Sequence, residues 1–111
     1  MTADKLGNKG VDVLATSVLV QLIEQACGDC IASLLEEGQI SLGTHIDIEH
    51  SKPVPVGFIV RIEAEIVTID GPRITFAVRV FDEQEAVAEG SHERYLIDRV
   101  KFREKLQEKL S

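Results

Sequence analysis

The sequence lacks an apolar run long enough to cross a membrane. Its longest apolar stretch, residues 18–26, is interrupted by Gln21 and Glu24, whereas a spanning helix needs about 20 largely apolar residues. The N-terminal segment MTADKLGNKG is polar and has no apolar centre of the kind found in a signal peptide. The sequence therefore predicts a cytoplasmic protein with no membrane partner.

An excess of positive charge is also absent. The chain carries 12 Lys and Arg residues against 19 Asp and Glu residues, which gives a formal net charge of −7. The basic residues are scattered along the sequence and do not form a stripe of the kind that follows a phosphate backbone. Nucleic acid is therefore not expected as a partner.

Cysteine is scarce, and its two copies form a single CxxC pair, Cys27 and Cys30. A structural zinc site needs four ligands, and no second Cys/His cluster with suitable spacing follows. A redox-active pair usually begins a helix, where the helix dipole lowers the thiol pKa, but these two lie in the middle of an apolar helix. We therefore expect reduced, buried thiols, and neither a metal nor a cofactor.

The 111 residues are enough for one domain, over residues 1–111, and no internal repeat divides them. The segment from Thr16 to Gly38 predicts one long helix, because its apolar residues keep the i, i+3, i+4 spacing of a single stripe. Thr16 or Ser17 is the expected N-cap, Glu36 and Glu37 close the helix, and Gly38 follows it.

Four runs with strand character follow the helix, at residues 39–50, 58–69, 74–81 and 86–97. An Asp70-Gly71-Pro72 turn joins the second and third runs, and Gly90 is interpreted as a bulge in the fourth. Asp98 is expected to cap a short terminal helix. One long buried helix followed by a meander of antiparallel strands predicts an α+β protein with a sheet folded across that helix.

Two polar residues interrupt this apolar pattern. Alternation along SLGTHIDIEH places Leu42, Thr44, Ile46, Ile48 and His50 on the inward face, so a titratable imidazole lies where the pattern predicts core. Glu24 borders the apolar stripe of the helix. A carboxylate that holds an imidazole, beside the hydroxyl of Thr16 at a helix N-terminus, has the parts needed for acyl transfer. The alternatives are a core histidine, a solvated glutamate and a plain N-cap.

The segments VLATSVLVQLIEQAC, SLGTHIDIEH, PVPVG and GSHERYLID occur in an order and spacing that resemble the fluoroacetyl-CoA-thioesterase-like branch of the hotdog superfamily. The resemblance implies a hotdog fold and a catalytic set at Thr16, Glu24 and His50, with Gly43 as a small residue that lets the substrate approach. Val20 and Arg94 are further candidates for substrate binding. The family carries a strand before the VLAT segment, and this strand is expected to be short or missing here.

Together these features predict an acyl-CoA thioesterase for short or compact acyl groups, working as a homodimer. Thr16 is expected to be the nucleophile or to orient water, with His50 as the general base. Glu24 either fixes the imidazole tautomer or itself attacks or activates water, and the residues alone do not decide between these assignments. A non-catalytic hotdog module that binds acyl-CoA or another small molecule is the alternative, and a hotdog hydratase ranks below it. The dimer is expected because apolar side chains, among them Val67, Ile69 and Phe81, lie on nominally outer faces.

Overall fold

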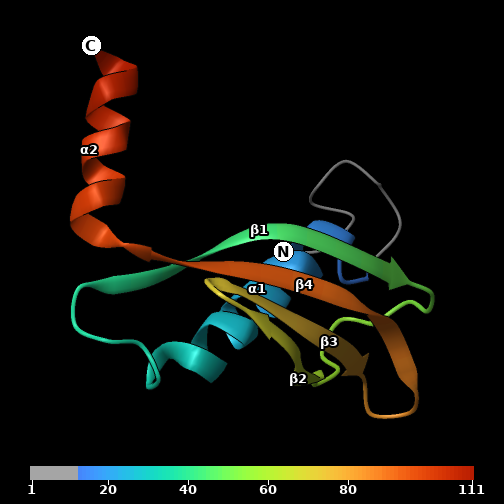
Figure 1. Cartoon of the computed structure of the whole chain (residues 1–111). Helices are drawn as coiled ribbons and strands as arrows, with labels where there is room; N and C mark the ends of the chain where they lie inside the picture. Colours follow the sequence, from blue (N-terminus) through green and yellow to red (C-terminus); the bar gives the residue numbers. More distant parts are fainter. Residues whose placement is uncertain (1–12) are drawn as a thin grey trace.

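The computed structural model describes residues 13–111 as one helix, a sheet and a projecting second helix. The elements are α1 (Thr16–Ala32), β1 (Gln39–His50), β2 (Arg61–Asp70), β3 (Arg73–Phe81), β4 (Ala86–Asp98) and α2 (Arg99–Leu110). The four strands form an antiparallel sheet in the order β1-β4-β3-β2. α1 lies across one face of this sheet (Figure 1). The expected α+β hotdog arrangement is confirmed, whereas the question of a short or missing first strand falls on residues 1–12, outside the described part.

α1 packs on the sheet through one line of side chains. Its buried residues are Leu19, Ile23, Cys27 and Ile31. These residues recur every fourth position, which places them on one side of the helix. The other apolar side chains of α1 are only half-buried or exposed, so the described chain does not enclose the helix on all sides.

The ends of α1 differ from the sequence prediction. The helix begins at Thr16, with Ala15 as the N-cap residue and no side chain capping it. It ends at Ala32, and a turn follows in which the Leu34 amide donates to the Ile31 carbonyl. Leu34 is 71% exposed, so no apolar contact extends the helix toward Gly38. Gly38 does adopt a positive φ of 83°, but it directly precedes β1 and lies six residues beyond the end of α1, so it does not cap the helix.

A β-bulge corrects the predicted inward face of β1. The register of β1 against β4 shifts between Gly43 and His45, so Thr44 is an extra residue and the alternation of side chains changes phase there. Ser41 and Gly43 therefore share the inner face with Ile46, Ile48 and His50. Leu42 and Thr44, which alternation had placed inside, are exposed.

The rest of the sheet follows the predicted plan with small shifts at the boundaries. β2 begins at Arg61, three residues later than expected, and Phe58 and Val60 pack against the core before the strand starts. The hairpin turn after Asp70 is confirmed, with Gly71 at a φ of 59°. Asp98 caps α2, as expected, because its carboxylate accepts the Lys101 amide at 3.0 Å.

The outer edge of β1 has no strand beside it in the described part of the chain, since β1 ends the strand order. Apolar side chains elsewhere also remain uncovered, including Val67 at 54% and Ile69 at 68% exposure. Phe81, by contrast, is half-buried beneath the guanidinium groups of Arg61 and Arg79. None of the described helices is long and apolar enough to span a membrane.

Gly90 has a different structural role from the bulge expected at this position. It pairs in register with Ile48 of β1 and Val78 of β3, and a Cβ atom placed on it would collide with the backbone carbonyl of Asp47. The glycine therefore permits the close approach of β1 and β4.

We predict that Gly90→Ala lowers the free energy of unfolding by about 1–3 kcal/mol, the usual cost of forcing an extra methyl group into a packed site. The added methyl group would clash with the backbone of Asp47, which cannot rotate away as a flexible side chain would. Urea denaturation followed by circular dichroism measures the change, with Ser91→Ala on the same strand as the control. A Gly90→Ala protein as stable as the control would contradict this role for Gly90.

Candidate active site

Thr16 and His50 meet at the point where α1 begins and β1 ends. The Thr16 Oγ1 atom lies 3.0 Å from the Nδ1 atom of His50. The two residues are 34 positions apart in sequence, and the antiparallel course of β1 along α1 brings them together. The His50 Nε2 atom is buried and, among the described residues, has no hydrogen-bond partner.

The first turn of α1 adds hydrogen-bond donors to this pair. The Val18 and Leu19 amides already donate to the Ala15 carbonyl, so among the described residues the Thr16 and Ser17 amides are the ones left without a partner. The amides at the start of a helix have no carbonyl within the helix to bind, and the helix dipole favours negative charge there. A carbonyl oxygen that becomes negative beside Thr16 would be stabilised by these groups.

The expected contact between Glu24 and His50 is not present in the described chain. Glu24 lies eight residues beyond Thr16, which corresponds to roughly 12 Å along a helix axis, and its side chain is exposed. The structure thus brings together two of the three residues expected to act as a unit. The third lies farther along α1.

A cluster around Arg94 occupies the other end of β1, close to Glu24. Arg94 Nε donates to the Ser41 hydroxyl at 3.0 Å, and Nη2 donates to the Ser41 carbonyl at 3.1 Å. Nη1 donates to the Glu24 carbonyl at 3.2 Å and lies 3.1 Å from His92 Nε2. Arg94 therefore ties α1 to β1 and β4. Among the described residues, four of the five guanidinium N–H groups are used in this way, and one on Nη2 has no partner.

His92 is the buried polar residue of this cluster, with only 1% of its surface exposed. Burial lowers the pKa of His92, and the neighbouring Arg94 charge acts in the same direction. A neutral ring fits the contacts, because Nδ1 lies 2.8 Å from the His45 carbonyl and can donate to it while Nε2 accepts from Arg94. The sequence alone assigns His92 no role, because the change of phase at Thr44 that turns Gly43 toward its ring is visible only in the register of β1 against β4.

Gly43 lies directly against this cluster. A Cβ atom placed on Gly43 would come within 2.9 Å of His92 Cε1 and 3.4 Å of Arg94 Nη1. Any larger residue would push into these side chains, which is consistent with the small residue expected here. Val20, the third candidate for substrate binding, is half-buried on α1 between the Thr16 turn and Glu24.

The two cysteines differ from each other. Cys27 is buried and Cys30 is exposed, and both are free thiols. Burial raises the pKa of the Cys27 thiol to about 11, which opposes formation of a reactive thiolate. The expectation of two buried thiols is therefore correct for Cys27 and wrong for Cys30.

An apolar cavity of about 320 Å³ opens beside the N-terminal half of α1. Leu14 and Leu22 line one side of it, and residues 54–58 with Val60 line the rest. Its wall at Leu14 is two residues from Thr16, so apolar space is available next to the Thr16–His50 pair.

Known proteins share both the sequence and this geometry. Residues 1–100 match the protein family described as fluoroacetyl-CoA-specific thioesterase. A fluoroacetyl-CoA thioesterase from Streptantibioticus cattleyicolor is 37% identical over 98 residues, which cover 88% of this chain and 70% of that protein. A mutant of the fluoroacetyl-CoA-specific thioesterase FlK, crystallised with fluoroacetate and CoA, superposes with a TM-score of 0.89 at 33% identity. That superposition covers 99% of this chain and 91% of the other.

A more distant structure supports the fold alone. A hot-dog-like protein from Thermanaerovibrio acidaminovorans superposes with a TM-score of 0.90 over 100% of this chain and 84% of its own, at 18% identity. Together with the sheet and helix described above, these likenesses define a hotdog-fold protein of the thioesterase class. The chain belongs to the fluoroacetyl-CoA-specific thioesterase family.

The lowered pKa of His92 predicts a pH-dependent stability. Between the ordinary histidine pKa of about 6.5 and the lower value in the folded protein, the unfolded chain binds a proton that the folded chain does not. His92 therefore contributes stability that is fully present above about pH 6.5 and is lost as the pH falls below it. We predict that His92→Gln reduces the loss of unfolding free energy between about pH 7.5 and about pH 5.5.

Urea denaturation at the two pH values measures this difference, and His45→Gln, which removes an exposed histidine, is the control. Equal pH dependence in wild type and His92→Gln would show that His92 does not limit stability in acid.

Proposed function

We propose that this protein hydrolyses short or compact acyl-CoA thioesters as a homodimer, in the cytoplasm. The observation that carries the proposal is the Thr16–His50 hydrogen bond at the N-terminus of α1, because it joins a hydroxyl, a base and oxyanion donors in one place. The similarity to thioesterases whose names specify fluoroacetyl-CoA supports the substrate class. Two free cysteines fit a reducing compartment.

In the proposed reaction the Thr16 hydroxyl attacks the thioester carbonyl carbon. His50 takes the hydroxyl proton on Nδ1, and the amides at the start of α1 stabilise the oxyanion. When the carbon–sulfur bond breaks, the proton passes to the departing CoA thiolate. Water, activated by the same imidazole, then hydrolyses the acyl-threonine ester and restores the enzyme. Alternatively, Thr16 orients the water that attacks directly, or Glu24 is the base or nucleophile.

The orphaned Nε2 atom of His50 points to the role of Glu24. If Nδ1 accepts the Thr16 proton, the neutral ring carries its hydrogen on Nε2, and a buried donor without an acceptor costs about 1–3 kcal/mol. A carboxylate at this position would satisfy Nε2 and stabilise the imidazolium. Glu24 of the same chain lies too far along α1 to reach His50, but Glu24 of a second copy could supply this carboxylate.

The free edge of β1 provides the position for that second copy. A twofold axis at this edge would pair two β1 strands antiparallel, which places the His50 end of each strand beside the Gln39 end of the other. The Glu24, Gly43 and Arg94 region of one copy would then lie near Thr16 and His50 of the other. Such a site would use all six candidate residues, with the free N–H of Arg94, Gly43 and Val20 facing the substrate.

The function is tested by release of CoA thiol from a series of acyl-CoA esters. We expect faster hydrolysis of acetyl-CoA or butyryl-CoA than of dodecanoyl-CoA, since bulky residues line the apolar space beside Thr16.

His50→Ala should lower kcat by about 10²–10⁴, the usual effect of removing a positioned proton-transfer group. Thr16→Ser should retain more activity than Thr16→Ala.

A protein that binds acyl-CoA without releasing thiol would be the non-catalytic module instead. If His50→Ala lowered the melting temperature but left turnover per folded molecule unchanged, His50 would be a core histidine and the mechanism would be wrong.

The shared site predicts complementation between two inactive variants. Thr16→Ala and Glu24→Gln should each be strongly impaired alone. When the two are mixed and allowed to exchange subunits, we expect recovery of about a quarter of wild-type activity, because half of the dimers become mixed and each mixed dimer has one intact site. Mixing Thr16→Ala with His50→Ala is the control, since both changes affect the same half-site and should not complement. Recovery in the control, or none in the test pair, would contradict a site shared in this way.

A further inference from the structure

α2 is the least integrated element of the fold. None of its residues is buried, and it leaves the sheet after the Arg99 amide donates to the Gly38 carbonyl at 2.9 Å. Along one side it carries an apolar stripe of Phe102, Leu106 and Leu110, spaced four residues apart. Leu106 is 46% exposed and Leu110 87% exposed. A helix of about 12 residues is only marginally stable in water without packing, so a surface that covered this stripe would stabilise α2.

α2 carries a local excess of positive charge. α2 contains five of the 12 basic residues and only two acidic ones, although the whole chain has a net charge of −7. Lys101, Lys105 and Lys109 recur every four residues and so form a row beside the apolar stripe. We call Arg99–Leu110 with this row and stripe the arm.

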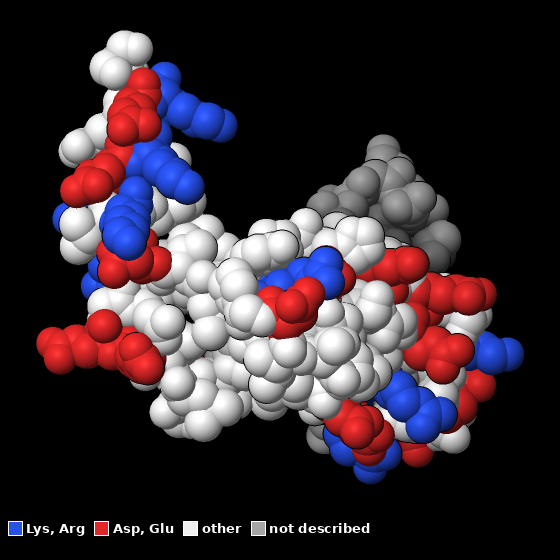
Figure 2. All heavy atoms as spheres, viewed as in Figure 1, with Lys and Arg blue, Asp and Glu red and all other residues white. Residues whose placement is uncertain are grey.

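The arm extends past the free edge of the sheet. In Figure 1, α2 rises from one end of the sheet beyond β1, on the side where no described strand pairs with β1. Figure 2 shows a hollow between α2 and the body of the molecule, and the Lys and Arg side chains visible on α2 point mostly toward it. A chain that paired with the edge of β1 would therefore lie next to the arm.

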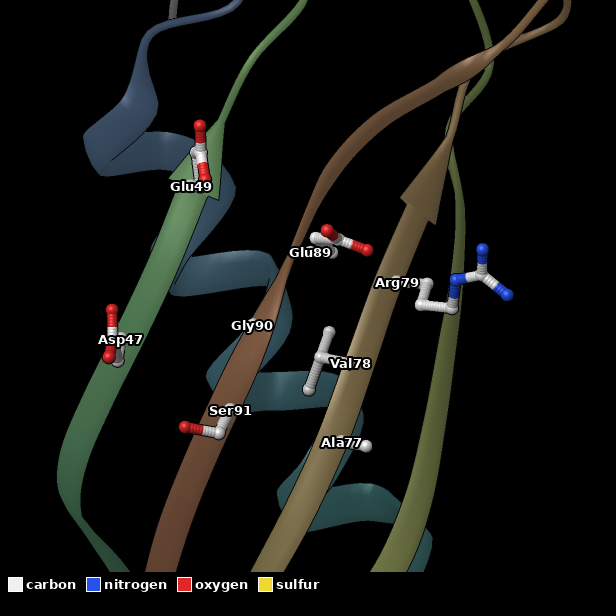
Figure 3. Close-up of a pocket in the computed structure, with 8 residues that line it drawn as sticks. All are labelled: Asp47, Glu49, Ala77, Val78, Arg79, Glu89, Gly90 and Ser91. Carbon is white, nitrogen blue, oxygen red and sulfur yellow. The ribbon is translucent and has the colours of Figure 1, made fainter.

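An acidic surface lies at the opposite end of β1. Asp47, Glu49 and Glu89 line a shallow hollow of about 450 Å³ on the face of the sheet turned away from α1 (Figure 3). Glu49 and Glu89 are paired directly across the two strands, an arrangement in which like charges repel. Arg79, the one cation lining the hollow among the described residues, is paired across the strands with Glu89. Its guanidinium group nevertheless points away from the hollow (Figure 3). Neither salt bridge found between described residues involves these carboxylates. We call these three residues the acidic face.

We propose that the arm of each copy docks on the acidic face of a second copy of this chain. The inference rests on the homodimer proposed above. Antiparallel pairing of two β1 strands places the Gln39 end of one copy, where the arm is rooted, beside the His50 end of the other, where Asp47 and Glu49 lie. The lysine row then meets carboxylates that form no salt bridge within the described chain, and the apolar stripe is covered by the partner. Charge complementarity makes a second copy the fitting occupant.

Charge reversal on each side tests the proposal. In the arm variant, Lys105→Glu and Lys109→Glu are combined; in the face variant, Asp47→Lys and Glu49→Lys are combined. Dimer dissociation constants come from sedimentation velocity over a concentration series. Each variant alone should dissociate roughly tenfold or more readily than wild type, because like charges are brought together at both contacts of the dimer.

Mixing the two variants distinguishes docking between copies from contact within one chain. In a mixed dimer, the reversed arm meets the reversed face and the normal arm meets the normal face, so both contacts are restored. The mixture should therefore form heterodimers with a dissociation constant close to that of wild type. Glu63→Lys with Glu65→Lys, on the exposed face of the distant edge strand β2, makes the same change of charge as the face variant and should leave dimerisation unchanged.

The possible failures are distinct. If wild type is a dimer and the arm and face variants dimerise equally well, or if mixing does not restore dimerisation, the arm does not dock in this way while the dimer stands. If wild type sediments as a monomer and still hydrolyses thioesters, both the dimer and the docked arm are wrong but the thioesterase function stands.

Discussion

The packing of one line of α1 side chains against the sheet determines where every candidate site residue lies. Leu19, Ile23, Cys27 and Ile31 fix both the direction and the depth of the helix. With α1 held in this way, its first residue reaches the end of β1 and its later turns reach the start of β1. Arg94 secures the second of these positions through hydrogen bonds to α1 and β1. The Thr16–His50 pair and the Arg94–His92 cluster are thus two ends of a single packing arrangement.

The same arrangement leaves each chain incomplete. One line of α1 is buried, the outer edge of β1 is unpaired, and the carboxylate expected to support His50 lies on another turn of the helix. These features have a common explanation if a second copy lies along β1, because a twofold axis at that edge exchanges the two ends of the strand. Under this proposal the catalytic pair and the substrate cluster, which are separated within one chain, become neighbours between chains. The half-buried apolar side chains of α1 would then lie near the interface.

Much of the fold could be predicted from the sequence because periodicity reports burial directly. The long helix, the four strands, the turn at Gly71 and the Asp98 cap all follow from local patterns. The end of α1 could not be predicted, since Leu34 continues the apolar spacing but finds nothing to pack against. For the site, the sequence indicated Thr16 and His50, which the structure places in contact. It could not show that Glu24 lies apart from His50, or that His92 is buried against Arg94, because both depend on how distant segments are placed.

The bulge at Thr44 has a consequence for the way this strand encodes its function. His50 lies seven positions after Gly43, an odd offset, so in an uninterrupted strand the two residues would point to opposite faces of the sheet. The extra residue reverses the alternation between them and allows both to face α1. The alternation of inward and outward side chains in β1 therefore has one phase up to Gly43 and the opposite phase from His45 to His50. In an alignment of relatives, a chain with a one-residue gap at this position would lack the bulge. Its counterparts of Gly43 and His50 would then point to opposite faces of the sheet.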